Sequence, residues 1–265
     1  QREGYGGIGN VPLMSVWLAG KIQRLKFGAM FNTVPAWHPL RLAEDYATAD
    51  ILTEGRVRFG IGRGYINREI ETRGSPLEDN EANRDLFEEQ VDIIFKAWNQ
   101  QTFFHHGKYY DLPPKIVYRE KELEELTLVP RPSKLPVECW QPIVSVSSRG
   151  IDFMMKHGIK GVVPGGARVA EIARKWQTAH AERGCDTELG EGLALVLQVI
   201  LGETEEEAIS EAEVWFEEQI KVLSPLGMMP FLNREQILAT YDPEKASSAG
   251  LPTVRDLVRD GAWIC

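Results

Sequence analysis

Cysteine is scarce in this chain, because only Cys139, Cys185 and Cys265 occur among its 265 residues. Their number is odd and no two of them have CxxC spacing, so a disulfide framework is not expected. All three are predicted to be free thiols in a protein of the reducing cytoplasm. Cys139 lies beside Trp140, just before an apolar stretch, where burial in the core is favoured over a nucleophilic role.

Positive charge and long apolar runs are lacking as well. The 30 Lys and Arg residues are outnumbered by 39 Asp and Glu residues, which gives a net charge of −9. Such a protein is not expected to bind nucleic acid or an anionic membrane, and a bound phosphate would need a few local cations. No run of 18 apolar residues occurs, so no transmembrane helix is expected. No secretory signal is visible, although Gln1 is not a natural first residue and a leader could precede it.

Helical and strand-like patterns alternate along the chain, and this order predicts an α/β fold with a parallel sheet. The site of such a fold lies at the carboxyl ends of its strands. Helices are expected at 11–22, 38–52, 84–98, 151–157, 167–183, 204–222 and from about 253. Strands are expected at 25–30, 56–62, 143–147, 160–163 and 193–201, and a β-hairpin at 102–112. The almost uninterrupted apolar stretch 193–201 is expected to be buried on both faces.

The segment Arg56–Tyr65, RVRFGIGRGY, is the most informative part of the sequence. A strand pattern in Val57, Phe59 and Ile61 is followed by glycines on either side of Arg63. A cation presented with unhindered backbone at the end of a strand is suited to an anion such as a phosphate.

Several motifs together resemble one family. HPLRLAED (38–45) precedes GRGY (62–65), Arg84 is expected to open a helix about twenty residues later, and PRPSKLPVECWQPIVSVSS ends at Ser148. This pattern resembles the bacterial luciferase-like flavin monooxygenases along the chain as far as Val163, and only in topology beyond it. The resemblance implies a TIM (β/α)8 barrel, of which residues 1–265 would be a single domain with strands missing at both ends. The catalytic histidine of the family would then precede Gln1, which leaves the catalytic residues unknown.

The resemblance also implies the chemistry. Members use reduced FMN, supplied by a separate flavin reductase, and O2 to place one oxygen atom on a small organic substrate, and they suggest a homodimer. Two alternatives stay open, namely a hydride-transfer oxidoreductase that uses a deazaflavin coenzyme on the same barrel, and a non-catalytic flavin-binding subunit. No metal site is expected, because the neighbouring His105 and His106 would point to opposite faces of a strand.

The resemblance places Arg63 and Arg84 at the FMN phosphate, with Ser147, Ser148 and Arg149 at a helix start beside it. The alternatives are a surface charge for Arg63, an ion pair with Glu88 for Arg84, and a plain helix cap for Ser147. The family pattern departs from this sequence at Val146 and Gly150, so the phosphate cradle would differ in detail.

The remaining predicted contacts concern the flavin ring and the substrate. The resemblance suggests a cis peptide between Met30 and Phe31 behind the ring, with core packing as the alternative. Gly62, Gly64 and Tyr65 are expected beside the cofactor, and Tyr65 has packing as its alternative. The segment 223–252 is predicted to be a lid or insertion, with a dimer contact or a disordered loop as alternatives. The predicted substrate pocket is largely apolar, and its residues are Trp37, Met228, Met229 and Phe231.

Overall fold

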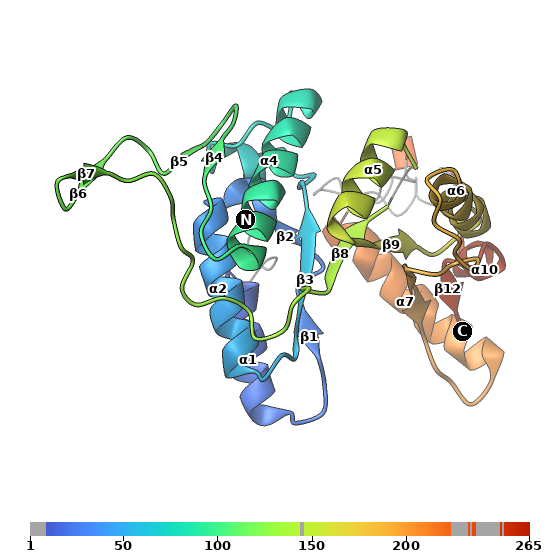
Figure 1. The fold of residues 1–265 in the computed structure, drawn as a ribbon. Helices are drawn as coiled ribbons and strands as arrows, with labels where there is room; N and C mark the ends of the chain where they lie inside the picture. Colours follow the sequence, from blue (N-terminus) through green and yellow to red (C-terminus); the bar gives the residue numbers. More distant parts are fainter. Residues whose placement is uncertain (1–8, 144–145, 224–232, 234, 237–249, 251) are drawn as a thin grey trace. The chain divides into compact units, whose positions relative to one another are not determined.

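The computed structural model describes residues 9–143, 146–223, 233, 235–236, 250 and 252–265 (Figure 1). The chain divides into two compact units, Gln1–Pro142 with Ser147–Gly161, and Ile143–Val146 with Val162–Cys265. Both units contain buried apolar side chains of their own. The residues predicted to contact a cofactor phosphate all belong to the first unit.

The first unit is organised around one central strand, β3 (Val57–Gly62). On one edge, β1 (Phe27–Gly28) and then β2 (Asn32–Thr33) pair with it, and on the other edge β8 (Cys139–Pro142) does. All three pairings are parallel, and β9 (Lys160–Pro164) follows β8 in the strand order. The first unit therefore confirms the expected parallel α/β organisation, with β3 at its centre.

Helices of the first unit pack beside this sheet, and α2 lies next to α4 (Figure 1). They are α1 (Val11–Lys21), the 3-10 turn η1 (Val34–Ala36), α2 (Pro39–Leu52), α3 (Asn67–Glu71), α4 (Asn80–Asn99) and α5 (Ser148–His157). α4 begins four residues before its expected start, because the Asp79 side chain caps it by accepting from the backbone N–H groups of Glu81 and Ala82. Arg84 therefore lies in the second turn of α4 and does not open the helix. Among the described residues, no helix is both long enough and apolar enough to cross a membrane.

Two hairpins follow α4. β4 (His105–His106) and β5 (Asp111–Leu112) form the expected antiparallel pair within 102–112. A second hairpin, β6 (Val117–Tyr118) with β7 (Lys121–Glu122), was not predicted from the charged loop around it. It extends away from the rest of the first unit (Figure 1), and Val117 is 77% exposed.

The second unit contains the end of β9, β10 (Leu193–Val196) beside it, and a small parallel pair. This pair consists of β11 (Gln198–Val199) and β12 (Trp263–Ile264). Its helices are α6 (Val169–Ala181), α7 (Glu205–Leu223) and α10 (Val254–Arg259). Phe216 of α7 and Trp263 of β12 meet edge to face in the core of this unit. Thr253 and Asp256 form a capping box at the start of α10, where a helix was expected from about 253.

Two strand predictions differ from the structure. The apolar stretch 193–201 is not buried on both faces, since Leu195 is 51% and Leu201 83% exposed, and it is divided between β10 and β11. Within the described part of the chain, β9 is the only strand paired with β10, so the other edge of β10 has no strand partner. Residues 144 and 145 of the strand expected at 143–147 lie outside the described residues, and the strand described here, β8, ends at Pro142, with Cys139 and Trp140 paired to Phe59 and Gly60.

Candidate functional site

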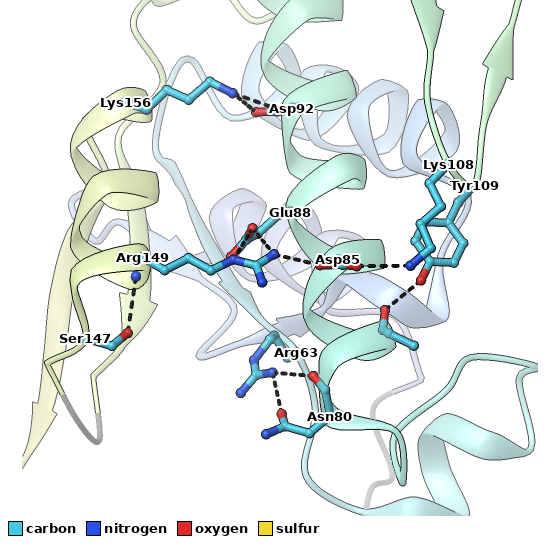
Figure 2. A network of polar contacts seen from close by, with 12 residues as sticks. Arg63, Asn80, Asp85, Glu88, Asp92, Lys108, Tyr109, Ser147, Arg149 and Lys156 are labelled. Carbon is cyan, nitrogen blue, oxygen red and sulfur yellow. Dashed lines mark hydrogen bonds and ion pairs between the residues drawn. The ribbon is translucent and has the colours of Figure 1, made fainter.

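Arg63 follows the end of β3 and is fixed by the start of α4 (Figure 2). Its guanidinium donates to the side-chain oxygen of Asn80 at 2.8 Å and to the Asn80 carbonyl oxygen at 3.4 Å. The Asn83 amide in turn donates to the Arg63 carbonyl oxygen at 3.3 Å. Arg63 is half-buried, so the structure does not support the alternative of a freely solvated loop charge.

The glycines around Arg63 have steric reasons of their own. A Cβ at Gly60 would overlap the Ala29 carbonyl oxygen, so β3 needs glycine where the chain before β2 approaches it. Gly64 has a φ of +83°, and a Cβ there would lie 2.5 Å from the Cδ1 atom of Ile70. The glycine pattern therefore reports backbone packing, and it is weaker evidence for an anion than the sequence suggested.

Arg84 is a cation for which the described residues provide no partner. No hydrogen bond or ion pair of its side chain occurs among the described residues, and the expected pair with Glu88 does not form. Glu88 binds Arg149 instead, with its Oε2 atom 2.7 Å from Nη2 and 3.0 Å from Nε. Burial lowers the pKa of Arg63, and the nearby charges of Arg84 and then Arg149 lower it further, against an opposing effect of Glu88. An unpaired guanidinium thus lies near a second one, and an anion would relieve their repulsion.

Ser147 caps α5, as the alternative interpretation predicts. Its hydroxyl accepts from the Gly150 N–H at 3.2 Å, and Ser147 and Ser148 are both exposed. The first N–H groups of a helix face outward and favour negative charge. The cap and an anion contact are compatible, because a hydroxyl that accepts one hydrogen bond can still donate another.

Arg149 lies across from two carboxylates of α4 (Figure 2). Besides Glu88 it binds Asp85, whose Oδ1 atom is 2.7 Å from Nη2. The Oδ2 atom of Asp85 also forms an ion pair with the Lys108 ammonium group at 3.0 Å. Hydrogen bonds with Glu88 and Asp85 raise the pKa of Arg149, and those from Arg149 and Lys108 lower the pKa of Asp85. The Arg149 guanidinium is therefore engaged within the protein, and what it does here is join the first turn of α5 to α4.

Sequence reasoning missed this network, although its spacing is visible. Asp85, Glu88 and Asp92 occur at i, i+3 and i+7 on one side of α4, and cations follow at similar spacing on α5. Lys156 and His157 bind Asp92 at 2.7 Å and 2.6 Å (Figure 2 shows the Lys156 contact).

Removal of the Asp92 charge is expected to destabilise the chain in a pH-dependent manner. Burial raises the pKa of Asp92, but the contacts with His157 and Lys156 outweigh it, so the folded-state pKa is lower than the unfolded one. The resulting stability is present above about pH 4 and is lost as the pH falls through the folded pKa. Asp92→Asn should cost about 1 kcal/mol or less at pH 7, because the pairs are partly exposed. Urea unfolding at pH 7 and pH 3 measures the difference, with Glu54→Gln as control, and a loss that persists at pH 3 would contradict the assignment.

The peptide between Met30 and Phe31 is cis, as the resemblance suggested. It lies between β1 and β2, with Met30 61% exposed and the Cβ of Phe31 3.3 Å from the position of a Cβ at Gly62. Tyr65 is 64% exposed. The exposed positions of Met30 and Tyr65 are compatible with contact to a cofactor, which stays a prediction.

The predicted substrate pocket is only partly described. Trp37 lines a cavity of about 500 Å³ together with Leu86 of α4. Arg63 and Arg84 are called the cation cluster below. Since Leu86 and Arg84 are two residues apart on a helix, the cavity and Arg84 lie on different faces of α4. Met228, Met229 and Phe231, like most of the predicted lid 223–252, lie outside the described residues.

The other reactive side chains have structural partners. Burial raises the pKa of the Cys139 thiol, as expected for a packing role in β8. His105 contacts Glu89 at 3.0 Å, and His106 contacts Asp111, so the two histidines face different carboxylates. Across the residues that the structure describes, no group of three or more potential metal ligands is found.

Comparison with known proteins gives a consistent result. The oxygenase component of the flavin-dependent trigonelline monooxygenase of Acinetobacter baylyi is 25% identical over 246 residues, which cover 86% of this chain and 62% of that protein. The oxygenating constituent of 3,6-diketocamphane monooxygenase from Pseudomonas putida, solved in complex with FMN, has a TM-score of 0.66 at 22% identity over 96% of this chain and 69% of its own. An F420-dependent secondary alcohol dehydrogenase has a TM-score of 0.63 at 15% identity, over 97% of this chain and 70% of its own.

The chain spans between 31% and 62% of the length of the first three curated relatives that it matches. The family model for luciferase-like monooxygenases matches residues 3–262, which is nearly the whole sequence. The chain therefore belongs to the luciferase-like monooxygenase family.

Proposed function

We propose that this chain belongs to a flavin-dependent monooxygenase that uses reduced FMN and O2 on a small, largely apolar organic substrate. The observation that carries the proposal is that the charges of Arg84 and Arg149, the latter in the first turn of α5, both act on Arg63, while Arg84 has no hydrogen bond or ion pair among the described residues. Family membership and the flavin-dependent relatives support the same reaction class. The sheet of the first unit would then be part of a complete (β/α)8 barrel.

The residues present fit the phosphate group of FMN. A phosphate is a compact anion with several acceptor oxygens, and it would accept from both guanidinium groups and from the helix N–H groups at Ser148 and Arg149. The Ser147 hydroxyl can donate to the same group while it caps the helix. Arg149 would not bind the phosphate through its guanidinium, since Asp85 and Glu88 occupy it, and would instead hold the α5 terminus in place. Bound reduced FMN would supply the redox and oxygen chemistry, while the protein binds and orients it.

The side chains near the ring and the substrate have a different task. Met30, Phe31, Gly62, Gly64 and Tyr65 are proposed to contact the flavin. Trp37, with Met228, Met229 and Phe231, is proposed to exclude water from the substrate. The catalytic acid or base is unknown.

Partners follow from the relatives. The trigonelline enzyme is named as an oxygenase component, so a separate flavin reductase is proposed here too. A homodimer and a cytoplasmic location are further proposals, and they rest on the resemblance and on the three free cysteines.

A deazaflavin-dependent hydride transfer is the second candidate, because an F420-dependent dehydrogenase matches the fold about as well as the diketocamphane enzyme does. Equilibrium titration with FMN and with the deazaflavin coenzyme separates the two. FMN is expected to bind at least about tenfold more tightly. Preference for the deazaflavin would overturn the monooxygenase proposal.

Turnover is tested separately from binding. With NADH and an added flavin reductase, O2 uptake above that of the reductase alone is expected once a suitable substrate is present. FMN binding without any such uptake across a panel of apolar substrates would favour the non-catalytic subunit.

A further inference from the structure

We propose that the cavity beside Trp37 is a second ligand site, separate from the cation cluster, and that it takes a small aromatic carboxylate. The cavity has a volume of about 500 Å³, within the usual range for small-molecule sites. It is formed by four segments of the first unit, namely the loop before α2, the loop before α4, one side chain of α4 and the loop of the β4–β5 hairpin. Because Trp37 also belongs to the predicted substrate pocket, the inference rests on the proposed function for the role of the ligand, but it does not depend on the identity of the flavin.

Hydrogen bonds between the lining segments hold the walls of the cavity in place. The Ser75 hydroxyl donates to the Pro35 carbonyl oxygen, which joins the two loops before α2 and α4. Gln90, which is only 1% exposed, donates through Nε2 to the Trp37 carbonyl oxygen at 2.9 Å and to the Tyr110 hydroxyl at 2.7 Å. A cavity whose walls are fixed in this way does not need to be opened by its ligand.

The backbone of the hairpin loop is held by the carboxylate of Glu89. It accepts from the backbone N–H groups of Lys108, Tyr109 and Tyr110 at 2.9–3.1 Å, and it contacts His105 at 3.0 Å. The two tyrosines are therefore presented to the cavity by a loop that is tied to α4.

Two polar side chains of the cavity, Arg73 and His38, can donate to a ligand, whereas the Tyr109 hydroxyl already donates to the Ala82 carbonyl oxygen. Arg73 has its nearest carboxylate, Glu69, at 3.7 Å, which is an ion pair but is too long for a hydrogen bond. Among the described residues, the ring nitrogens of His38 make no hydrogen bond, and its ring packs edge to face on Tyr110 at 5.6 Å. No aspartate or glutamate is among the residues that line the cavity. These groups are complementary to an anion.

The Tyr110 hydroxyl adds a further donor. The Trp37 carbonyl can only accept, so the nitrogen of the Gln90 amide must face it, and the same nitrogen donates to the Tyr110 oxygen. The hydroxyl hydrogen is therefore left for another acceptor. Burial, more than the charge of Glu89, raises the pKa of Tyr110 against the effect of Gln90, so the hydroxyl stays protonated at neutral pH.

The remaining lining residues favour a ligand in which a planar apolar group is attached to the anionic group. Pro35, Pro76 and Leu86 contribute aliphatic surface, and Trp37 and Tyr109 contribute rings. Aromatic rings stack against such side chains with a preferred geometry, which a short aliphatic acid would not use. The combination of rings with Arg73 and Tyr110 therefore specifies an aromatic carboxylate.

Calorimetric titration of the purified chain with benzoate tests the site. Benzoate should bind in a saturable manner, and its neutral amide, benzamide, about tenfold or more weakly. Arg73→Gln should reduce benzoate affinity by a similar factor and leave FMN affinity unchanged. Arg63→Gln should do the reverse.

A second variant keeps the test valid if Arg73→Gln fails to fold. Ala36→Leu removes no polar contact and narrows the cavity, so it should also weaken benzoate binding while FMN still binds. Three results would overturn the proposal: no saturable benzoate binding, equal affinity for benzamide, or wild-type benzoate affinity in both cavity variants. Loss of both ligands in Arg73→Gln and in Arg63→Gln would also overturn it, because the two sites would then be one.

Discussion

Replacement of Arg84 by glutamine is expected to weaken FMN binding by about 1.5–3 kcal/mol, the scale of a hydrogen bond to a charged group. It should leave the free energy of unfolding nearly unchanged, because the guanidinium makes no ion pair among the described residues. Arg63→Ala should weaken FMN binding by a similar amount, but also destabilise the chain, since Arg63 binds Asn80. Fluorescence titration of FMN and urea unfolding measure the two effects.

Arg41→Gln is the matched control for these variants. Arg41 is an exposed arginine of α2 that pairs with Glu44 and Asp45 and is not among the predicted phosphate contacts. It should change neither FMN affinity nor, by more than about 0.5 kcal/mol, stability. Unchanged FMN affinity in Arg84→Gln and Arg63→Ala would refute the phosphate role of the cluster.

Truncation of Trp98 should have the largest effect on stability. The side chain is fully buried, with its ring 4.9 Å from Phe59 and 5.0 Å from Tyr46, and its indole N–H donates to the Ala43 carbonyl oxygen at 3.1 Å. It thereby joins α4, α2 and β3. Trp98→Ala removes this contact area and leaves a cavity, which should cost about 3–5 kcal/mol.

Two variants help to interpret that result. Trp98→Phe retains a ring and loses the hydrogen bond, so its cost should be smaller. Trp17→Ala removes a tryptophan that is 60% exposed on α1 and should cost less than about 0.5 kcal/mol. A Trp98→Ala protein as stable as Trp17→Ala would contradict the placement of Trp98 in the core.

The sequence predicted the elements better than it predicted their surroundings. The helical pattern of 38–52 and the aromatic alternation of 102–112 correspond to α2 and to the β4–β5 hairpin. Burial of 193–201 could not be predicted in the same way, since apolar composition shows what a strand can bury and not what lies beside it. The start of α4 was misplaced because the capping role of Asp79 was overlooked within an acidic segment.

For the candidate site, the sequence indicated which residues come together but not how they are paired. The charge of Arg84 acts on Arg63 although the two are twenty-one positions apart in the sequence, and their shared contact with a phosphate stays a prediction. The choice between Arg84 and Arg149 as the partner of Glu88 depends on where α5 lies against α4. The i,i+4 spacing along α4 favours an ion pair between Glu88 and Arg84, but Glu88 pairs with Arg149 of α5 instead.

The position of β3 has a consequence for hydrogen exchange. Its backbone is paired on both edges, by β1 and β2 on one side and by β8 on the other, and most of its residues are buried. Each amide of β3 exchanges with solvent only when the pairing on its own edge opens, and neither edge of the strand is left to solvent, so β3 should belong to the most protected part of the first unit. Arg63 directly follows this strand, so its backbone is attached to the segment whose amides are expected to exchange most slowly in the first unit.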